Sequence, residues 1–307
     1  MTTSGTASFN LNLNELVEEA FERCGHELRT GYDLRTARRS LNLLAADWAN
    51  RGINLWTLEQ GIIDLTQGRG VYPLPVDTVD LLDHVVRNGA GQNQTDINIS
   101  RISESTFLTI PNKNAQGRPI QVWINRQNGQ TSATTITLNG AISNAVTTIT
   151  LSTVQGLSTE GFIQLDSETI QYNGVDTETN QILECIRGVN GTTAASHLNN
   201  TKVYVQWIPT INIWPKPNVN DTYSFVYYRL RRIQDAGTGV TTEDIPFRFI
   251  PAMVAGLAYY LSLKLPGAEM RVEMLKAMYD EAFQLAADED REKASVRFVP
   301  RSSFYYM

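Results

Sequence analysis

The sequence predicts an α+β protein whose two ends are helical and whose middle is built of strands. Apolar residues recur at helical spacing over residues 12–51 and again over 246–290, whereas the chain between them alternates in short segments. A threonine-rich stretch, 131–205, has no helical period and is punctuated by glycines. We therefore expect the terminal helices to form one antiparallel helical bundle beside a central β-sandwich or sheet domain, which carries an inserted small all-β sandwich or barrel.

The bulk composition is that of an ordinary soluble protein. The chain has 307 residues, 42% of them hydrophobic and 19% charged, and no apolar run approaches the roughly 20 residues that span a bilayer. The start lacks the basic and apolar regions of a signal peptide. Cys24 and Cys185 lie in unlike contexts and indicate neither a disulfide framework nor a metal site, which fits synthesis in a reducing cytoplasm. A net charge of -6 argues against tight wrapping of nucleic acid, but it allows nucleic acid to slide past.

A helical hairpin is predicted over Asn12–Arg51. Apolar residues step by three and four along its first helix, and Asn12 followed by Glu15 has the pattern of a capping box. Asp33 is the expected N-cap of the second helix, which has an apolar stripe of its own and ends at Gly52. The two helices should lie side by side, because the connection between them is short.

Short strands are expected on both sides of the threonine-rich stretch, in a β domain made of residues 52–130 and 206–245. The alternation of apolar residues and the turn signals between the segments carry this prediction. The predicted strands are Trp56–Leu65, Val71–Leu74, Val79–Arg87, Arg118–Gln127, Gln206–Pro215 and Thr222–Gln234, with a helical turn at Ser103–Leu108.

The threonine-rich stretch, 131–205, is interpreted as a self-contained module inserted into a loop of the host, which is then 1–130 with 206–290. Insertions succeed at exposed loop tips, because the two ends of the inserted segment can lie close together. Its predicted strands are Thr134–Leu138, Thr147–Leu151, Phe162–Leu165, Thr169–Tyr172, Ile182–Arg187 and Val203–Val205.

Two further helices meet at Pro266-Gly267 in the C-terminal part of the host. The first is apolar nearly all round, so it must be covered on more than one side. The other strong helical signals lie in the N-terminal hairpin, so we expect the two helical pairs to pack together. The second helix has a single apolar stripe, made of Leu275, Met278, Tyr279, Ala282, Leu285 and Ala286.

Residues 291–307 form a basic and aromatic tail after a strongly acidic helix. Large apolar side chains are costly to leave in water, so the tail is expected to dock onto a partner. Pro300 and the lack of a helical period favour an extended segment that adds as a strand. The docking residues are Val296, Arg297, Phe298, Val299, Arg301, Phe304, Tyr305 and Tyr306.

The chain carries few signs of catalysis. The three histidines show no metal-ligand spacing, and the common nucleotide-binding and hydrolase motifs do not occur. Asp166 and Glu168 are two residues apart on one side of a predicted strand, where a carboxylate pair can bind a cation or do acid–base work. No third acidic partner lies nearby in the sequence, so a solvated strand face is the preferred interpretation. We expect no enzyme activity, no cofactor and no metal.

An ordered set of segments resembles a known family. The segments are Leu43–Gln60, Tyr72–Arg87, Arg118–Gln127, Ile211–Pro217, Tyr223–Ala236 and Asp244–Lys264. In this order they resemble the head-to-tail adaptor proteins of short-tailed bacteriophages, which are also called connectors or tail tubular protein A. The resemblance covers most of the host, from about Leu13 to Asp290.

The resemblance implies a structural virion protein at the portal–tail junction, made in the host cytoplasm. Proteins of this family form rings, typically dodecamers, between the portal protein and the tail nozzle or tail tube protein, and tail fibres are a further partner. Double-stranded DNA would pass through the ring without sequence-specific binding, and no membrane is involved.

In that role the helical bundle forms the ring wall, the β domain meets the nozzle, and the tail reaches into the portal. An acidic channel would repel DNA phosphates and let the genome slide. The candidate channel-facing acidic residues are Glu269, Glu273, Asp280 and Asp288.

Two other functions stay open. Within the module, Gly161–Asn200 looks like small β modules that recur in phage structural proteins. The chain is alternatively a phage surface or tail protein whose inserted module binds carbohydrate or a receptor. A cell-wall hydrolase that uses Asp166 and Glu168 is the third function.

Overall fold

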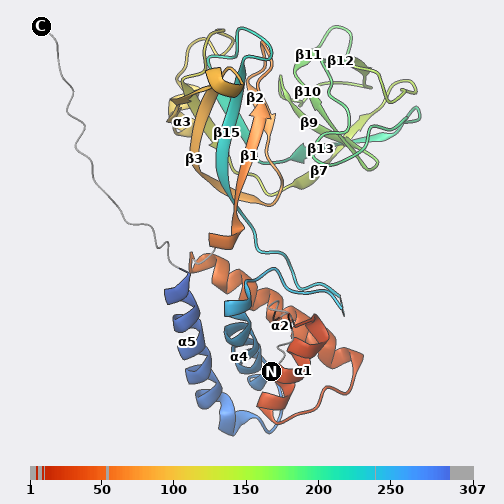
Figure 1. The fold of residues 1–307 in the computed structure, drawn as a ribbon. Helices are drawn as coiled ribbons and strands as arrows, with labels where there is room; N and C mark the ends of the chain where they lie inside the picture. The colour runs from red at the N-terminus through yellow and green to blue at the C-terminus, as the bar shows by residue number, and fades with distance from the viewer. Residues whose placement is uncertain (1–4, 6–8, 10, 53–54, 239, 291–307) are drawn as a thin grey trace, which may run out of the picture. The chain divides into compact units, whose positions relative to one another are not determined.

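The chain divides into two compact units. The computed structural model describes residues 5, 9, 11–52, 55–238 and 240–290. The helical unit takes the described residues up to Thr57 and from Ile233 onward, and the β unit takes Leu58–Arg232 (Figure 1). The fold is α+β, as the sequence predicts, because the N- and C-terminal helices pack together and the described residues between them form four sheets.

The helical unit is built from α1 (Leu13–Cys24), α2 (Gly31–Asn50), α4 (Ile250–Ser262) and α5 (Val272–Glu289). Helix α4 lies in the middle and contacts the other three helices, so helices from the two ends of the chain share one core (Figure 1). A Cβ atom at Gly256 of α4 would meet the Leu44 and Tyr279 side chains at 2.9 Å. Glycine is therefore what allows α4 to approach α2 and α5 this closely.

The start of α1 confirms the predicted capping box, whereas the predicted start of α2 is wrong. The side chain of Asn12 accepts from the backbone N–H of Glu15, and Glu15 accepts from the backbone N–H of Asn12. In α2 the N-cap is Thr30, and Asp33 is its capping-box partner three residues into the helix. The threonine hydroxyl completes this reciprocal pair, so the helix begins before Asp33.

The predicted apolar stripe of α5 is only partly correct. Leu275, Tyr279 and Ala286 are buried, but Met278 and Leu285 are exposed, and Phe283 packs into the core instead. A helix turns by about 100° per residue, so residues 275, 279, 283 and 286 form one narrow stripe. Met278 and Leu285 fall on the neighbouring side of the helix, which none of the described helices covers.

Two four-stranded sheets of the β unit share one apolar core. One has the order β1 (Leu58–Asp64), β15 (Tyr223–Arg231), β3 (Thr78–Asn88) and β4 (Thr95–Asn98). The other has the order β2 (Val71–Pro73), β14 (Thr210–Trp214), β6 (Gln121–Asn125) and β5 (Ser100–Arg101). Both sheets contribute residues to the core, and the short helix α3 (Glu104–Leu108) lies near β6.

The threonine-rich part of the β unit has a second core of its own. One sheet has the order β10 (Glu168–Tyr172), β9 (Gly161–Leu165), β13 (Lys202–Trp207) and β7 (Gln130–Thr137). The other has the order β11 (Gly174–Asp176), β12 (Gln181–Leu183) and β8 (Ile149–Thr150). Strand β11 was not predicted.

The predicted strand Gln206–Pro215 is wrong as a single element, since β13 ends at Trp207 and β14 begins at Thr210. Pro209 lies in the gap, and proline has no N–H for a ladder. The predicted strand is therefore two strands: β13 belongs to a sheet of the threonine-rich part, and β14 belongs to a sheet of the other core. A side-chain contact joins them as well, because Gln171 Nε2 donates to the Val71 carbonyl oxygen at 2.9 Å.

Candidate functional site

The predicted channel-facing carboxylates lie on the exposed side of α5. Glu273, Asp280 and Asp288 are on the helix, and Glu269 is in the single turn before it, Glu269–Arg271. All four are exposed. Glu273 and Asp280 are seven residues apart and so lie on the same side of the helix. This side faces away from the apolar core and presents negative charge to solvent.

The predicted docking tail, with Val296, Arg297, Phe298, Val299, Arg301, Phe304, Tyr305 and Tyr306, lies outside the described residues. The last described residue, Asp290, is buried and forms an ion pair with Arg248. Arg248 belongs to the single turn Phe247–Phe249 that precedes α4. The position from which the tail departs is therefore fixed to the helical unit.

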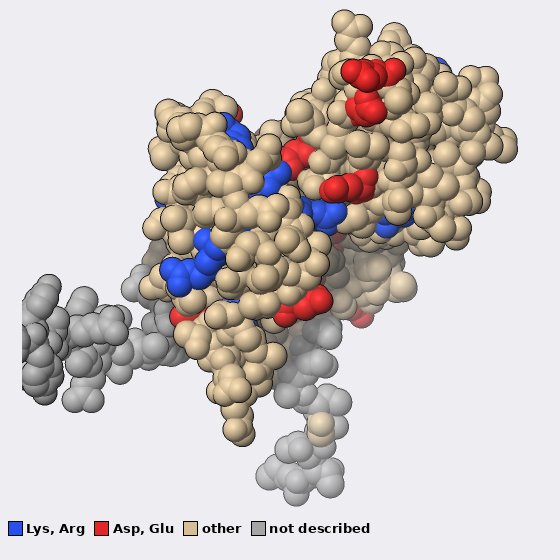
Figure 2. All heavy atoms as spheres, turned by 90° about the horizontal axis from the view of Figure 1, so that it is seen from above, with Lys and Arg blue, Asp and Glu red and all other residues tan. Residues whose placement is uncertain are grey.

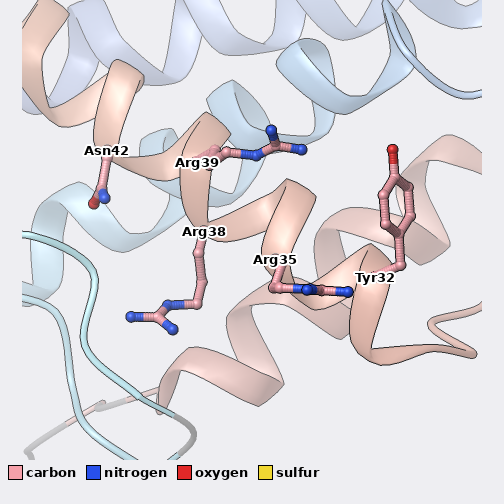
Figure 3. Close-up of a pocket in the computed structure, with 5 residues that line it drawn as sticks. All are labelled: Tyr32, Arg35, Arg38, Arg39 and Asn42. Atoms are coloured by element: carbon pink, nitrogen blue, oxygen red, sulfur yellow. The ribbon is translucent and has the colours of Figure 1, made fainter.

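An arginine cluster on α2 was missed in the sequence analysis. Arg35, Arg38 and Arg39 line an open pocket of about 480 Å³ together with Tyr32 and Asn42 (Figure 3). Arg35 and Arg39 extend toward Tyr32, whereas Arg38 extends to the other side. The signal was visible in the sequence, because positions i, i+3 and i+4 share one face of a helix.

Among the described residues, these arginines lack the carboxylate partner that Arg23, Arg29, Arg51 and Arg248 of the helical unit have. Arg38 Nη2 donates to the Ala236 carbonyl oxygen at 3.3 Å, and Arg39 Nη2 donates to Thr36 Oγ1 at 3.4 Å. By contrast, Arg51, the C-cap residue of the same helix, pairs with Asp47 at 2.7 Å. Within the described part of the chain no carboxylate forms an ion pair with the three clustered arginines. Arg38 lies near the Glu243 carboxyl, whereas Arg35 and Arg39 are exposed, so their positive charge is available to an acidic partner.

A second open pocket, of about 460 Å³, continues along the same side of α2. It is lined by Tyr32, Arg39 and Leu43 from α2 and by Lys264 and Leu265, which follow α4. Lys264 Nζ donates to Ser40 Oγ at 2.8 Å, which holds the ammonium group beside the helix. The pocket combines apolar side chains with two cations and one carboxylate, Asp33, which is bound to Thr30. Its net positive charge suits an amphipathic acidic segment.

Asp166 and Glu168 do not form the solvated strand face that was predicted. Asp166 lies in the turn between β9 and β10 with a φ of 49°, and its side chain is exposed. Glu168, two residues later, is fully buried. The prediction was wrong because the segment between Arg187 and His197 folds over β10 and covers the Glu168 carboxylate.

The buried Glu168 carboxylate is surrounded by hydrogen-bond donors. Arg187 binds both of its oxygens at 2.8 Å, and the backbone N–H groups of Gly188 and Ala195 each donate at 3.0 Å. His197 Nε2 lies 2.8 Å from Glu168 Oε2, and His197 Nδ1 lies 2.8 Å from Asp166 Oδ2. Both contacts are hydrogen bonds when both ring nitrogens carry hydrogen.

Burial opposes ionisation of Glu168, but the hydrogen bonds from Arg187, the Ala195 N–H and His197 outweigh it and lower the pKa of Glu168 to about 2. A carboxylate with its oxygens committed in this way, and without exposure, has no contact with a substrate. The network instead holds the segment from Arg187 to His197 against β10. The sequence signal for this network was the scarcity of basic residues, because Arg187 is one of two between 131 and 205.

The face of the β unit that Figure 2 shows does not resemble a nucleic-acid interface. In the view of Figure 2, lysines and arginines lie in small separate groups and do not join into an extended basic surface. Between residues 5 and 290, wherever the structure describes the chain, no group of three or more His, Cys, Asp or Glu residues could hold a metal ion. The described helices also include none that is both long enough and apolar enough to cross a membrane.

The charged and apolar surfaces of the helical unit are the strongest candidate site among the described residues. No protein-family model matches the chain, and no curated protein matches it in sequence, so its function is inferred from its own residues and structure.

Proposed function

We propose that this chain is a ring-forming head-to-tail adaptor, a structural virion protein that joins a phage portal to the tail nozzle. Two of the segments that resemble the adaptor family, Leu43–Gln60 and Asp244–Lys264, lie far apart in sequence but contact each other in the structure. This contact is the observation that carries the proposal. Trp56 Nε1 donates to the Asp244 carbonyl oxygen at 3.0 Å. The rings of Trp48 and Trp56 also pack on Phe249, with centroids 5.4 and 4.9 Å away.

The adaptor function implies a role for each part of the chain. The four long helices make an antiparallel bundle that forms the ring wall, with 12–51 and 246–290 as its two halves. The β domain of 52–130 and 206–245 faces the nozzle, and the module of 131–205 is an attached decoration. Separate apolar cores for the host strands and for the module support this division.

The charges of the helical unit support assembly from copies of one chain. Its α2 helix carries arginines that form no ion pair with a described carboxylate, and its α5 helix carries exposed carboxylates. Opposite charges on two surfaces of one unit favour a head-to-tail contact, which closes into a ring when the rotation allows it. The carboxylates that remain toward the channel would keep DNA from sticking.

Electron microscopy of the purified full-length protein, alone and mixed with portal rings of the same phage, tests the proposal. Closed rings with a central channel, seated on one end of the portal, are the expected result. A protein that stays monomeric in both conditions and never joins the portal contradicts the adaptor function.

The second candidate function is carbohydrate binding by the module. The observation that favours it is an open pocket of about 480 Å³ lined by polar side chains, among them Gln164, Asp166, Lys202 and Tyr204. Sugar hydroxyls need such hydrogen-bonding groups beside an aromatic ring. A glycan array probed with the full-length chain tests this function, with Tyr204→Ala as the matched variant. Equal signals from the two proteins would contradict a sugar site in this pocket.

A further inference from the structure

An exposed apolar stripe runs along α5. Met274, Met278 and Leu285 are 53%, 42% and 64% exposed. Their spacing puts them on one side of the helix, next to the buried stripe but separate from it. Glu281 lies beside them and is also exposed. We call Met274, Met278, Glu281 and Leu285 the α5 stripe. An exposed row of large apolar side chains on a helix is a common mark of a protein–protein contact.

A surface of complementary composition lies on the other side of the helical unit. It is the second pocket on α2, and we call its Tyr32, Arg39, Leu43, Lys264 and Leu265 the α2 groove. Tyr32 and Leu43 are 64% and 58% exposed. The groove thus offers apolar contacts of the same kind as the α5 stripe. Its charges are net positive, because Arg39 and Lys264 line it together with a single carboxylate, Asp33, which is bound to Thr30.

The α5 helix of the same chain cannot fill this groove. Leu275 and Tyr279 hold α5 in the core of the unit, so its exposed stripe points away from the chain that carries it. Figure 1 shows α5 on the opposite side of α4 from α1, whose Phe21 contributes to the lining of the groove. The occupant must therefore come from outside the chain's own helical unit.

Charge decides between two apolar candidates for that occupant. The C-terminal tail of another copy is apolar and aromatic, but it carries Arg291, Lys293, Arg297 and Arg301. These would meet Arg39 and Lys264 with like charge, which disfavours association. The α5 stripe carries Glu281 instead, and methionine side chains adapt their shape to a groove.

We propose that the α5 stripe of one copy docks as a helix into the α2 groove of a second copy, with Glu281 beside Arg39 and Lys264. The contact is head-to-tail, because the two surfaces differ, and repeating it builds a ring or an open helix of subunits. The inference rests on the proposed function, in that it names the surfaces by which the adaptor ring assembles.

Charge reversal on each surface tests the contact. Arg39→Glu and Glu281→Arg each place like charges across the interface, so each variant alone should weaken self-association by about tenfold or more. An equimolar mixture of the two variants and the double variant both bring opposite charges together across the contact again, so both should regain assembly. Arg39 and Glu281 are exposed, so the fold of each variant should be kept.

The control is Arg29→Glu, the same charge change at an exposed position of the same unit outside the groove, which should assemble as the wild type does. Sedimentation velocity of the full-length proteins, alone and with portal rings, gives the readout. Single variants that assemble like the wild type, or variants that the mixture and the double variant fail to rescue, overturn the contact while the adaptor function stands. A wild type that assembles in neither condition overturns both.

Discussion

Trp48 Nε1 donates a hydrogen bond of 2.9 Å to Tyr279 Oη, and so joins α2 to α5 across the core of the helical unit. Both side chains are buried. The same tyrosine ring lies near the guanidinium of Arg51, at 5.7 Å from its centroid. The second helix of the chain, α2, and the last, α5, are thus connected by a specific polar contact as well as by apolar packing.

Tyr279→Phe tests the value of this contact. The substitution leaves the indole N–H of Trp48 buried without its acceptor, so we expect a loss of about 1–3 kcal/mol in the free energy of unfolding. Chemical denaturation followed by tryptophan fluorescence measures it. Tyr228→Phe is the matched control, because that tyrosine is half exposed and should change stability by less than about 0.5 kcal/mol. Equal effects of the two substitutions would show that the hydrogen bond contributes nothing.

The close approach at Gly256 predicts a penalty for the smallest added side chain. Gly256→Ala should cost about 1–3 kcal/mol, because the new methyl group meets Leu44 and Tyr279 side chains in a packed core. Gly31→Ala is the control, since a Cβ at that position meets nothing within 4 Å. Thermal unfolding compares them. A Gly256→Ala protein as stable as Gly31→Ala would mean that the helices move apart at no cost.

Glu168→Gln should strongly destabilise the module. The change removes a buried charge and leaves Arg187 uncompensated, which typically costs about 3–5 kcal/mol. Hydrogen exchange measured by mass spectrometry localises the effect, and we expect faster exchange over residues 187–197 in particular. Asp166→Asn is the control, because the Asp166 side chain is 65% exposed. Faster exchange of similar size in both variants would argue against a special role for the buried carboxylate.

The lowered pKa of Glu168 predicts a pH dependence. The pKa falls from an ordinary value of 4.5 to about 2 in the folded protein. The unfolded chain therefore binds this proton first, so the network's contribution to stability is complete above pH 4.5 and is lost as the pH falls through about 2. Denaturation of wild type and Glu168→Gln over this range should show the difference between them narrowing as the pH falls. A constant difference would assign the stabilisation to groups other than this carboxyl.

Deleting Val296–Met307 tests the docking tail. The truncated protein should fold normally, because the described core ends before this segment, and its affinity for portal rings should drop by at least about tenfold as the aromatic anchors are lost. Co-sedimentation with portal rings measures the affinity, and full-length protein bearing Arg297→Ala and Arg301→Ala separates charge from apolar contact. A truncated protein that joins the portal with full affinity rules out the tail as the docking element.

Local sequence signals were sufficient where the interacting groups are neighbours in the chain. The capping box of α1 needs only Asn12 and Glu15, and it was predicted correctly. The helical periods at both ends of the chain and most strands of the β unit were also found, because periodicity reports which face of an element is apolar. The start of α2 failed for a local reason, since Thr30 and Asp33 are both good caps and the pattern alone did not rank them.

The candidate sites depended on contacts that the sequence does not display. Met278 and Tyr279 are neighbours on the predicted stripe of α5, yet one is exposed and the other buried, because the core of the unit covers only a narrow part of the helix. Likewise, the sequence alone determined that Asp166 and Glu168 are carboxylates at the spacing of a strand. Only the tertiary structure decided that one is in solvent and the other is buried. Arg187 and His197 come from a distant segment, and their hydrogen bonds offset the cost of removing Glu168 from water.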